Sequence, residues 1–260
     1  MTTGTVLEVA EVTKRFGNHA ALDAVSFSVR EREVVALLGD NGAGKSTLVK
    51  CIAGIHRPER GTIYVDGKPL NTGGAGSGRD SGIGIVYQDL ALFDNMSVAE
   101  NLFAGREPCW PRAPRGLGVV RRRAMLEEAR RTLHRLEVRV PNLKTPVGLL
   151  SGGQRQAIAV SKGIAFARKI VVLDEPTAAL GIRERTNVLR LVRQLPENGI
   201  SVILISHNLE EVISVADRAV VLRQGKMVGE VAATAENHET IVSLIVGGRT
   251  PLINGQSSHE

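Results

Sequence analysis

Short runs of apolar residues recur along the chain, separated by glycine-containing turns and by segments of mixed polarity. Continuous apolar runs, such as those at 34–38, 170–173 and 201–205, are typical of strands that are buried on both faces of a sheet. Alternating runs predict half-buried strands. The pattern predicts strands at 7–12, 24–29, 34–38, 61–67 with its closing turn, 83–87, 170–173, 201–205, 219–222 and 226–231.

Other segments carry apolar residues at helical spacing, with Leu126, Ala129, Leu133 and Leu136 as the clearest series. That series opens a helical region that reaches to about residue 168. A helix between the strands at 170–173 and 201–205 predicts a right-handed crossover between parallel strands. The fold class is therefore α/β, and the early strands suit a mixed or antiparallel sheet. Helices are predicted at 47–53, 121–137, 155–166 and 183–195.

Composition and charge narrow the possible classes of protein. The chain has 260 residues, of which 43% are hydrophobic and 23% are charged, so it is long enough for a sizeable core. No apolar run approaches the eighteen or so residues of a membrane-spanning helix, and the first residues do not resemble a secretory signal. Cys51 and Cys109 are too few for a disulfide framework and favour free thiols in a reducing cytoplasm.

The net charge is +6, and residues 106–135 account for it with nine arginines against three acids. Aromatic residues are only 3%, which argues against a platform for stacking nucleic-acid bases. The basic segment fits a solvated helix face, an anionic membrane surface or an acidic partner, and the solvated face is the favoured interpretation. Five glycines predict a flexible loop at 71–82, and the residues at 108–118 predict an exposed loop.

A phosphate-binding loop is the strongest motif. Residues 39–46 match G-x-x-x-x-G-K-[ST] in full, after an apolar strand and before a helix. Glycines let the backbone N–H groups surround phosphate oxygens, while Lys45 adds a charge toward the β- and γ-phosphates and Ser46 can ligate Mg²⁺. The predicted ATP-binding residues are Gly39, Asp40, Asn41, Gly42, Ala43, Gly44, Lys45, Ser46 and Thr47.

Two acids, Asp174 and Glu175, end the apolar strand at 170–173. At the carboxyl edge of a parallel sheet such acids face the ligand crevice. Asp174 is predicted to hold Mg²⁺, directly or through water, and Glu175 to act as the general base toward the attacking water. In isolation a surface turn would explain the pair, but the phosphate loop favours the catalytic interpretation.

A further candidate site lies where the helix at 155–166 begins. Ser151 and Gln154 predict a capping box, in which each side chain hydrogen-bonds the other residue's backbone N–H. Gly152 and Gly153 are not needed for a cap, since glycine weakens a first helical turn. A ligand that approaches the backbone closely would explain them, so a second anion site is predicted here.

Together these motifs resemble the nucleotide-binding subunit of ATP-binding cassette (ABC) transporters, over residues 7–231. The resemblance implies a P-loop NTPase cassette with a mixed central sheet, an N-terminal antiparallel β-subdomain and a helical subdomain. The motifs occur in the family's order: the phosphate loop at 39–47, Gln88, Leu150 with the signature Ser151, Gly152, Gly153 and Gln154, the acids Asp174 and Glu175, the segment 178–181, and His207.

The resemblance also implies roles for single residues. Phe16 matches the aromatic residue that stacks on adenine, although an ordinary core phenylalanine is the alternative. Gln88 would contact Mg²⁺ and the attacking water, and His207 would contact the γ-phosphate. The signature residues would bind ATP held by a partner subunit, so that two cassettes enclose two ATP molecules in a closed dimer.

Four stretches are similar to bacterial importers of monosaccharides of the ribose, xylose and fructose type. This similarity implies a homodimer of single cassettes that uses ATP and Mg²⁺, transmembrane permease subunits, and a periplasmic sugar-binding protein that acts indirectly. It also implies a peripheral location at the cytoplasmic face of the inner membrane and no nucleic-acid partner. The stretches are GDNGAGKST (39–47), YQDLALFDN (87–95), NLFAGRE (101–107) and EPTAALG (175–181).

The resemblance sets expected boundaries: a cassette over 5–250, a helical subdomain at about 89–168 and a disordered tail at 251–260. Two features depart from the family's pattern. Gly181 stands where most cassettes have Asp, which puts details of coupling across the dimer in doubt, and the glycine-rich loop at 71–82 replaces a short helical segment.

Three alternatives remain open from the sequence. The same ATPase could serve another cargo, such as an amino acid, a nucleoside or a lipid, because only the similarity at 87–107 points to sugar. A non-transport cassette would be expected to carry a long insertion or a tandem copy. A regulatory cassette that binds without hydrolysis is disfavoured by the intact Lys45, Asp174, Glu175 and His207.

Overall fold

The computed structural model describes residues 4–71, 82–87, 91–110, 118–165, 167–178 and 180–247. The strands are β1 (Thr5–Phe16), β2 (His19–Arg30), β3 (Val34–Leu38), β4 (Arg60–Val65), β5 (Lys68–Pro69), β6 (Ile83–Val86), β7 (Cys109–Trp110), β8 (Val119–Val120), β9 (Ile170–Asp174), β10 (Ser201–Ile205), β11 (Arg218–Arg223) and β12 (Lys226–Ala232). The helices are α1 (Lys45–Ile52), α3 (Val98–Phe103), α4 (Arg122–Arg135), α5 (Gly152–Ala165), α6 (Ile182–Gln194), α7 (Leu209–Val215) and α8 (His238–Val246), with 3-10 turns at Val147–Leu149 and Ala235–Asn237.

The central sheet has six strands in the order β12-β11-β3-β10-β9-β6. All neighbours pair in parallel except the β11–β12 hairpin, which turns at Gln224 and Gly225 as predicted. Every residue of β3 and β10 is buried, as their continuous apolar runs predict. Because the parallel strands run in one direction, their carboxyl ends meet at one edge of the sheet.

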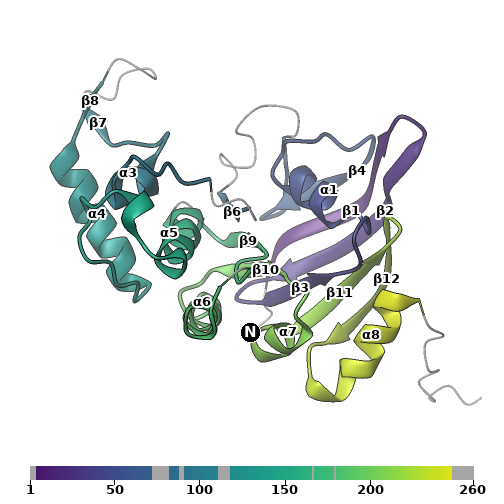
Figure 1. Ribbon diagram of the computed structural model, residues 1–260. Coiled ribbons are helices and arrows are strands. Elements are labelled where there is room, and N and C mark those ends of the chain that lie inside the picture. The colour runs from purple at the N-terminus through teal and green to yellow at the C-terminus, as the bar shows by residue number, and fades with distance from the viewer. Residues whose placement is uncertain are drawn as a thin grey trace, which may run out of the picture.

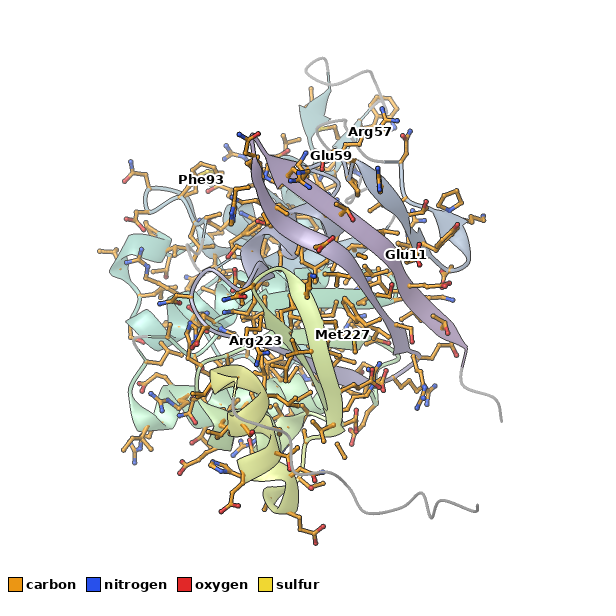
Figure 2. The ribbon with its side chains drawn as sticks, turned by 90° about the vertical axis from the view of Figure 1, so that its right-hand side faces the viewer. Glu11, Arg57, Glu59, Phe93, Arg223 and Met227 are labelled. Carbon is orange, nitrogen blue, oxygen red and sulfur yellow. The ribbon has the colours of Figure 1, made fainter. Side chains whose placement is uncertain are left out.

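A separate four-stranded antiparallel sheet has the order β2-β1-β4-β5, and its long strands occupy the right of Figure 1 and the upper part of Figure 2. Asp66 and Gly67 form the predicted turn with positive φ angles. The early strands are expected to suit a mixed or antiparallel sheet, and they divide between the two: β1, β2 and β4 join the antiparallel sheet, whereas β3 pairs with β10 and β11 in the mixed central sheet. A strand buried on both faces needs layers on both sides, and only the central position supplies them.

A buried ion pair joins the two sheets. Arg218 on β11 contacts Glu33 through Nε at 2.7 Å and reaches the carbonyl oxygen of Ser28 on β2. Glu230 lies 3.0 Å from its Nη1. Burial raises the pKa of Glu33, but the hydrogen bonds from Arg218 and the backbone N–H of Arg30 outweigh it, so the pKa lies below its ordinary value.

Helices α3, α4 and α5 pack around an apolar core of their own, to the left of the central sheet in Figure 1. Ala129, Leu133 and Leu136 are buried as the helical series predicts, while Leu126 is partly buried. Helix α5 comes very close to β6, because a Cβ on Gly163 would lie 2.4 Å from a methyl group of Val86. This close approach fixes the helix that begins with the signature residues.

Several expectations need correction or remain outside the described residues. The predicted loop at 108–118 contains the short strand β7, which pairs with β8 just after that range. Helices α3, α7 and α8 were not predicted. Most of the glycine-rich loop and all of the tail at 251–260 lie outside the described residues. Within the described ranges, no helix is long and apolar enough to cross a membrane, and both cysteines are free thiols.

Candidate functional site

The phosphate loop connects the buried strand β3 to α1. Gly39, Gly42 and Gly44 all have positive φ angles, which glycine adopts without strain. A Cβ on Gly39 would lie 2.2 Å from the carbonyl oxygen of Leu222, so no other residue fits there. The sequence therefore folds this segment into a loop that leads directly to the N-terminus of α1, which is suited to binding an anion.

Lys45 is held at the centre of this loop. Its Nζ donates to the carbonyl oxygens of Gly39 at 2.6 Å and Asp40 at 3.0 Å. Burial lowers the pKa of Lys45, and the negative charges of Glu175, Asp174 and Asp40 oppose that shift. The strands β3 and β9, separated by β10, thus bring the lysine and the two predicted acids together.

Asp174 ends β9 and Glu175 follows it. Burial raises the pKa of both carboxyls, while Lys45 opposes the shift at Asp174 and His207 opposes it at Glu175. The Oε1 atom of Glu175 is buried and has no hydrogen-bond partner among the described residues. A buried carboxylate oxygen that makes no hydrogen bond at this edge is suited to accept one from a ligand or a water.

His207 lies beside this carboxylate. It follows the carboxyl end of β10, and its Nε2 is 3.3 Å from Glu175 Oε1. The backbone of Glu175 has a φ angle of +51°, a left-handed conformation that is unusual for a residue with a side chain. Its N–H donates to the carbonyl oxygen of Ile205, which ties the two strand ends together.

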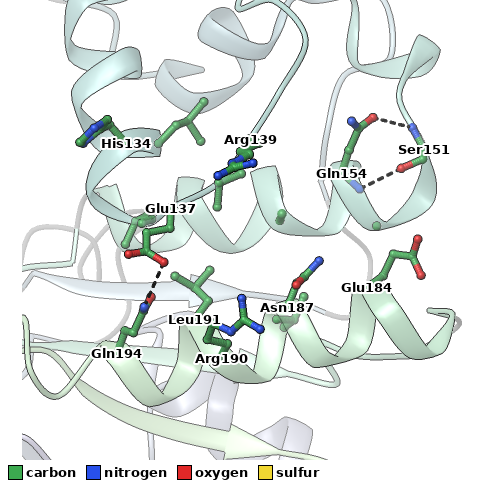
Figure 3. Close-up of a pocket in the computed structure, with 16 residues that line it drawn as sticks. His134, Glu137, Arg139, Ser151, Gln154, Glu184, Asn187, Arg190, Leu191 and Gln194 are labelled. Atoms are coloured by element: carbon green, nitrogen blue, oxygen red, sulfur yellow. Dashed lines mark hydrogen bonds between the residues drawn. The ribbon is translucent and has the colours of Figure 1, made fainter.

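The signature residues form a separate group. Ser151 and Gln154 make the predicted capping box: Ser151 N–H donates to Gln154 Oε1 at 3.1 Å, and Gln154 N–H donates to Ser151 Oγ at 3.3 Å (Figure 3). They line a groove of about 1010 Å³ between α5, α6 and the end of α4. Lys45 and the acids Asp174 and Glu175 are not among its lining residues.

The two signature glycines have different surroundings. A Cβ on Gly152 would meet nothing within 4 Å, so its backbone is open. A Cβ on Gly153 would lie 1.9 Å from Cγ of Glu184, whose side chain lies beside α5 in Figure 3. The side chain of Glu184 on α6 therefore lies close to the backbone of Gly153. The sequence predicted a ligand in this position and not a helix.

Phe16 ends β1 and is 48% exposed, so the alternative of an ordinary core phenylalanine is wrong. Its ring meets the ring of His56 edge-on at 5.4 Å, and Lys14 Nζ lies 5.4 Å from its centroid. An exposed ring in this position can accept a planar ligand, which keeps adenine stacking as a prediction.

A protein-family model described as "ABC transporter" matches residues 22–178. The chain is 41% identical to the xylose/arabinose import ATP-binding protein of Sulfolobus acidocaldarius over 92% of this chain and 93% of that protein. The chain belongs to the ABC transporter family. It is an ATP-binding cassette of the P-loop NTPase fold.

Other relatives of the cassette differ in length. It is 38% identical to the fructose import ATP-binding protein of Rhizobium meliloti over 95% of each chain. It is 43% identical to a ribose import ATP-binding protein of Rubrobacter xylanophilus over 93% of this chain, but it spans about half of that relative, 47%. A solved nucleotide-free cassette from an ABC transporter matches 94% of this chain and 98% of its own, with a TM-score of 0.81 at 26% identity.

Two predicted positions of the cassette have limited description. Gln88 lies outside the described residues, as does Ala179 within the segment 178–181. Gly181 is the N-cap of α6 and makes no side-chain cap, so the departure from Asp removes a group that could cap this helix.

Sequence reasoning missed one residue that supports the site. Glu211 on α7 is buried, and its Oε2 accepts hydrogen bonds from the hydroxyls of Thr177 at 2.6 Å and Ser206 at 3.3 Å. Thr177 follows Glu175 by two residues and Ser206 precedes His207 by one. Glu211 therefore links the segment that carries Glu175 to the segment that carries His207, and its Oε1 lies 3.2 Å from Arg185 Nε.

Proposed function

We propose that this cassette is the ATP-hydrolysing subunit of an import system for a monosaccharide. The observation that carries the ATPase part is the grouping of Lys45, Asp174, Glu175 and His207 at the carboxyl edge of one sheet. The relatives named for import of xylose or arabinose, ribose and fructose support the cargo class. A different solute would leave the ATP site unchanged and would be revealed by transport assays.

In the proposed reaction, the backbone N–H groups of the phosphate loop and Lys45 bind the phosphates and neutralise their charge. Glu175 orients the attacking water and accepts its proton, a role that fits its buried Oε1 atom, which makes no hydrogen bond within the described residues and lies 3.3 Å from His207 Nε2. His207 donates to the γ-phosphate, and the ring of Phe16 stacks on adenine.

The donor set fits Mg²⁺ as the cofactor. The hydroxyl of Ser46 and the carboxylate of Asp174 are hard oxygen ligands, which Mg²⁺ prefers, and Mg²⁺ commonly combines one or two carboxylates with phosphate oxygens and water. The described residues contain no group of three or more His, Cys, Asp or Glu that could hold a metal. Bound Mg²⁺ would neutralise charge on the phosphates, and Gln88 is proposed to contact it.

We further propose that two copies of the cassette act together and drive a separate transmembrane permease. The exposed N-terminus of α5, held by its capping box outside the phosphate-loop group, would meet ATP bound to the partner copy. Closure of two copies over ATP would be linked to the permease by their different affinities for its two states. A periplasmic sugar-binding protein would act through the permease, and the cassette would lie at the cytoplasmic face of the membrane.

Two substitutions separate binding from hydrolysis. In Glu175→Gln, binding of a fluorescent ATP analogue should be kept while phosphate release falls by at least about a hundredfold, because the base is lost. Lys45→Ala should instead weaken binding itself, since it removes the charge at the phosphates. Hydrolysis by Glu175→Gln at the parent rate would overturn the assignment of the base.

A further inference from the structure

The β7–β8 hairpin carries an exposed apolar patch that the ATPase site does not use. Trp110 is 69% exposed and Val119 is 76% exposed, and these two residues are directly opposite in the hairpin. Directly opposite residues project from the same face of a two-stranded sheet, so the indole and the valine are neighbours. Val120, which pairs with Cys109, is also exposed but projects from the other face of the hairpin. We call Trp110 and Val119 the hairpin patch.

Three exposed arginines, Arg121, Arg122 and Arg123, follow the hairpin directly at the start of α4. Arg122 lies near enough to Glu100 to help lower the pKa of that carboxyl. Neither Arg121 nor Arg123 forms a salt bridge with a residue in the described part of the chain. The guanidinium groups of Arg121 and Arg123 thus remain available to an outside anion.

The acids nearest in sequence do not cancel this charge. Glu107 accepts a hydrogen bond from the backbone N–H of Gly105, and Glu128 pairs with Arg131 one turn further along α4. Glu127 is exposed on the same helix. The segment keeps a local excess of positive charge, as its nine arginines against three acids over 106–135 require.

The hairpin patch is also well placed to reach a surface. Figure 1 shows β7 and β8 at the outer end of the part formed by α3 and α4, away from both large sheets. The backbone N–H of Arg121 donates to the carbonyl oxygen of Pro108 at 2.7 Å, which closes the base of the hairpin. A backbone hydrogen bond therefore joins the two strands at the base of the hairpin, next to α4.

We propose that the hairpin patch and Arg121–Arg123 bind the surface of a bilayer that contains anionic phospholipids. Tryptophan favours the headgroup level of a membrane, where its ring is in an apolar layer and its N–H remains hydrogen-bonded. Arginines beside it would contact the lipid phosphates. Two apolar side chains suit shallow insertion better than a stable protein interface, which buries about 800 Å² on each partner.

The chain offers a direct probe, because Trp110 is its only tryptophan. Tryptophan fluorescence of the whole protein should shift to shorter wavelength and resist iodide quenching when vesicles of phosphatidylglycerol and phosphatidylethanolamine are added. Vesicles of phosphatidylcholine should produce no such change, and added salt should reverse it because the attraction is screened. This binding goes beyond the proposed function and needs neither ATP nor a permease.

Matched variants test which residues bind. The triple variant R121Q/R122Q/R123Q should lower affinity for the anionic vesicles by about a hundredfold. The control R130Q/R131Q/R135Q removes the same charge from the far end of α4 and should lower affinity by less than about tenfold. In vesicle flotation, Trp110→Ser should bind anionic vesicles more weakly than the parent protein. Its ATPase rate should equal that of the parent, which would show that the variant is folded.

Three results would overturn the proposal. These are an unchanged spectrum with anionic vesicles, equal loss of affinity in the two triple variants, and a shift that occurs only when permease is reconstituted in neutral vesicles. The last result would assign the hairpin patch to a protein partner.

Discussion

Gly153 offers a sharp test of how the signature helix is held. In Gly153→Ala, the new methyl would lie 1.9 Å from Cγ and 2.7 Å from Cβ of Glu184. Ordinary van der Waals contact needs about 3.4 Å or more, and Cβ of Glu184 is fixed to the backbone of α6. Either α5 or α6 must therefore move.

The expected cost follows from two opposing terms. Forcing an extra methyl into a filled space costs about 1–3 kcal/mol, while alanine in place of glycine stabilises a helix by up to about 1 kcal/mol. We therefore expect Gly153→Ala to lower the free energy of unfolding by about 1–2 kcal/mol. Gly152→Ala is the matched control, because its methyl would meet nothing within 4 Å and should leave stability unchanged or slightly higher.

A double-mutant cycle with Glu184→Gly isolates the clash, since that change removes all three side-chain atoms of Glu184 that lie close to the methyl, Cβ, Cγ and Cδ. In this background Gly153→Ala should become neutral or stabilising, which gives a coupling free energy of about 1–3 kcal/mol. Urea unfolding of the four proteins measures it. The reasoning is refuted if Gly153→Ala destabilises no more than Gly152→Ala, or if its cost is the same without Glu184.

Three further predictions concern the site and the junction of the sheets. Glu211→Gln should lower kcat for ATP hydrolysis by about tenfold with little change in ATP affinity, because the hydroxyls of Thr177 and Ser206 lose a charged hydrogen-bond acceptor. The control is Glu210→Gln at the exposed neighbouring residue, and equal hydrolysis rates in the two variants would contradict the prediction. The pKa of Glu33 is lowered in the folded state, so its ion pair with Arg218 stabilises the fold above the ordinary pKa near 4.5, and this stabilisation is lost as pH falls through the folded-state pKa. In urea unfolding, Glu33→Gln should therefore lower the free energy of unfolding by about 3 kcal/mol at pH 7 and by clearly less at pH 3. The same loss at both pH values would show that this ion pair does not cause the fall in stability at acidic pH. Phe16→Ala should raise the KM for ATP by about tenfold through loss of stacking, and an unchanged KM would place adenine elsewhere.

Features set by neighbouring residues could be predicted from the sequence. The phosphate loop, the acids after β9 and the capping box at Ser151 and Gln154 each depend on a few adjacent positions, and the structure has the loop and the capping box as predicted. The roles of Asp174, Glu175 and His207 in hydrolysis remain predictions, although the fold brings the three residues to one edge.

Contacts between distant segments could not be predicted. Glu211 and Thr177 are 34 residues apart, and only the packing of α7 beside β9 and β10 brings them together. The pairing of β3 with β10 depends in the same way on the whole sheet. Helix α7 did leave a local signal, since Asn208 caps it and accepts from the backbone N–H of Glu211. The strands β7 and β8 are too short to produce a pattern.

Uptake of labelled solutes by a strain that lacks this chain tests the central claim most directly. The panel would hold several monosaccharides, with amino acids and a nucleoside as controls, and the strain would be complemented by the parent or by Glu175→Gln. The account predicts selective loss of one monosaccharide, restored by the parent protein and not by Glu175→Gln. Loss of an amino acid or nucleoside with normal sugar uptake would contradict the sugar assignment, and restoration by Glu175→Gln would contradict a role for hydrolysis in transport.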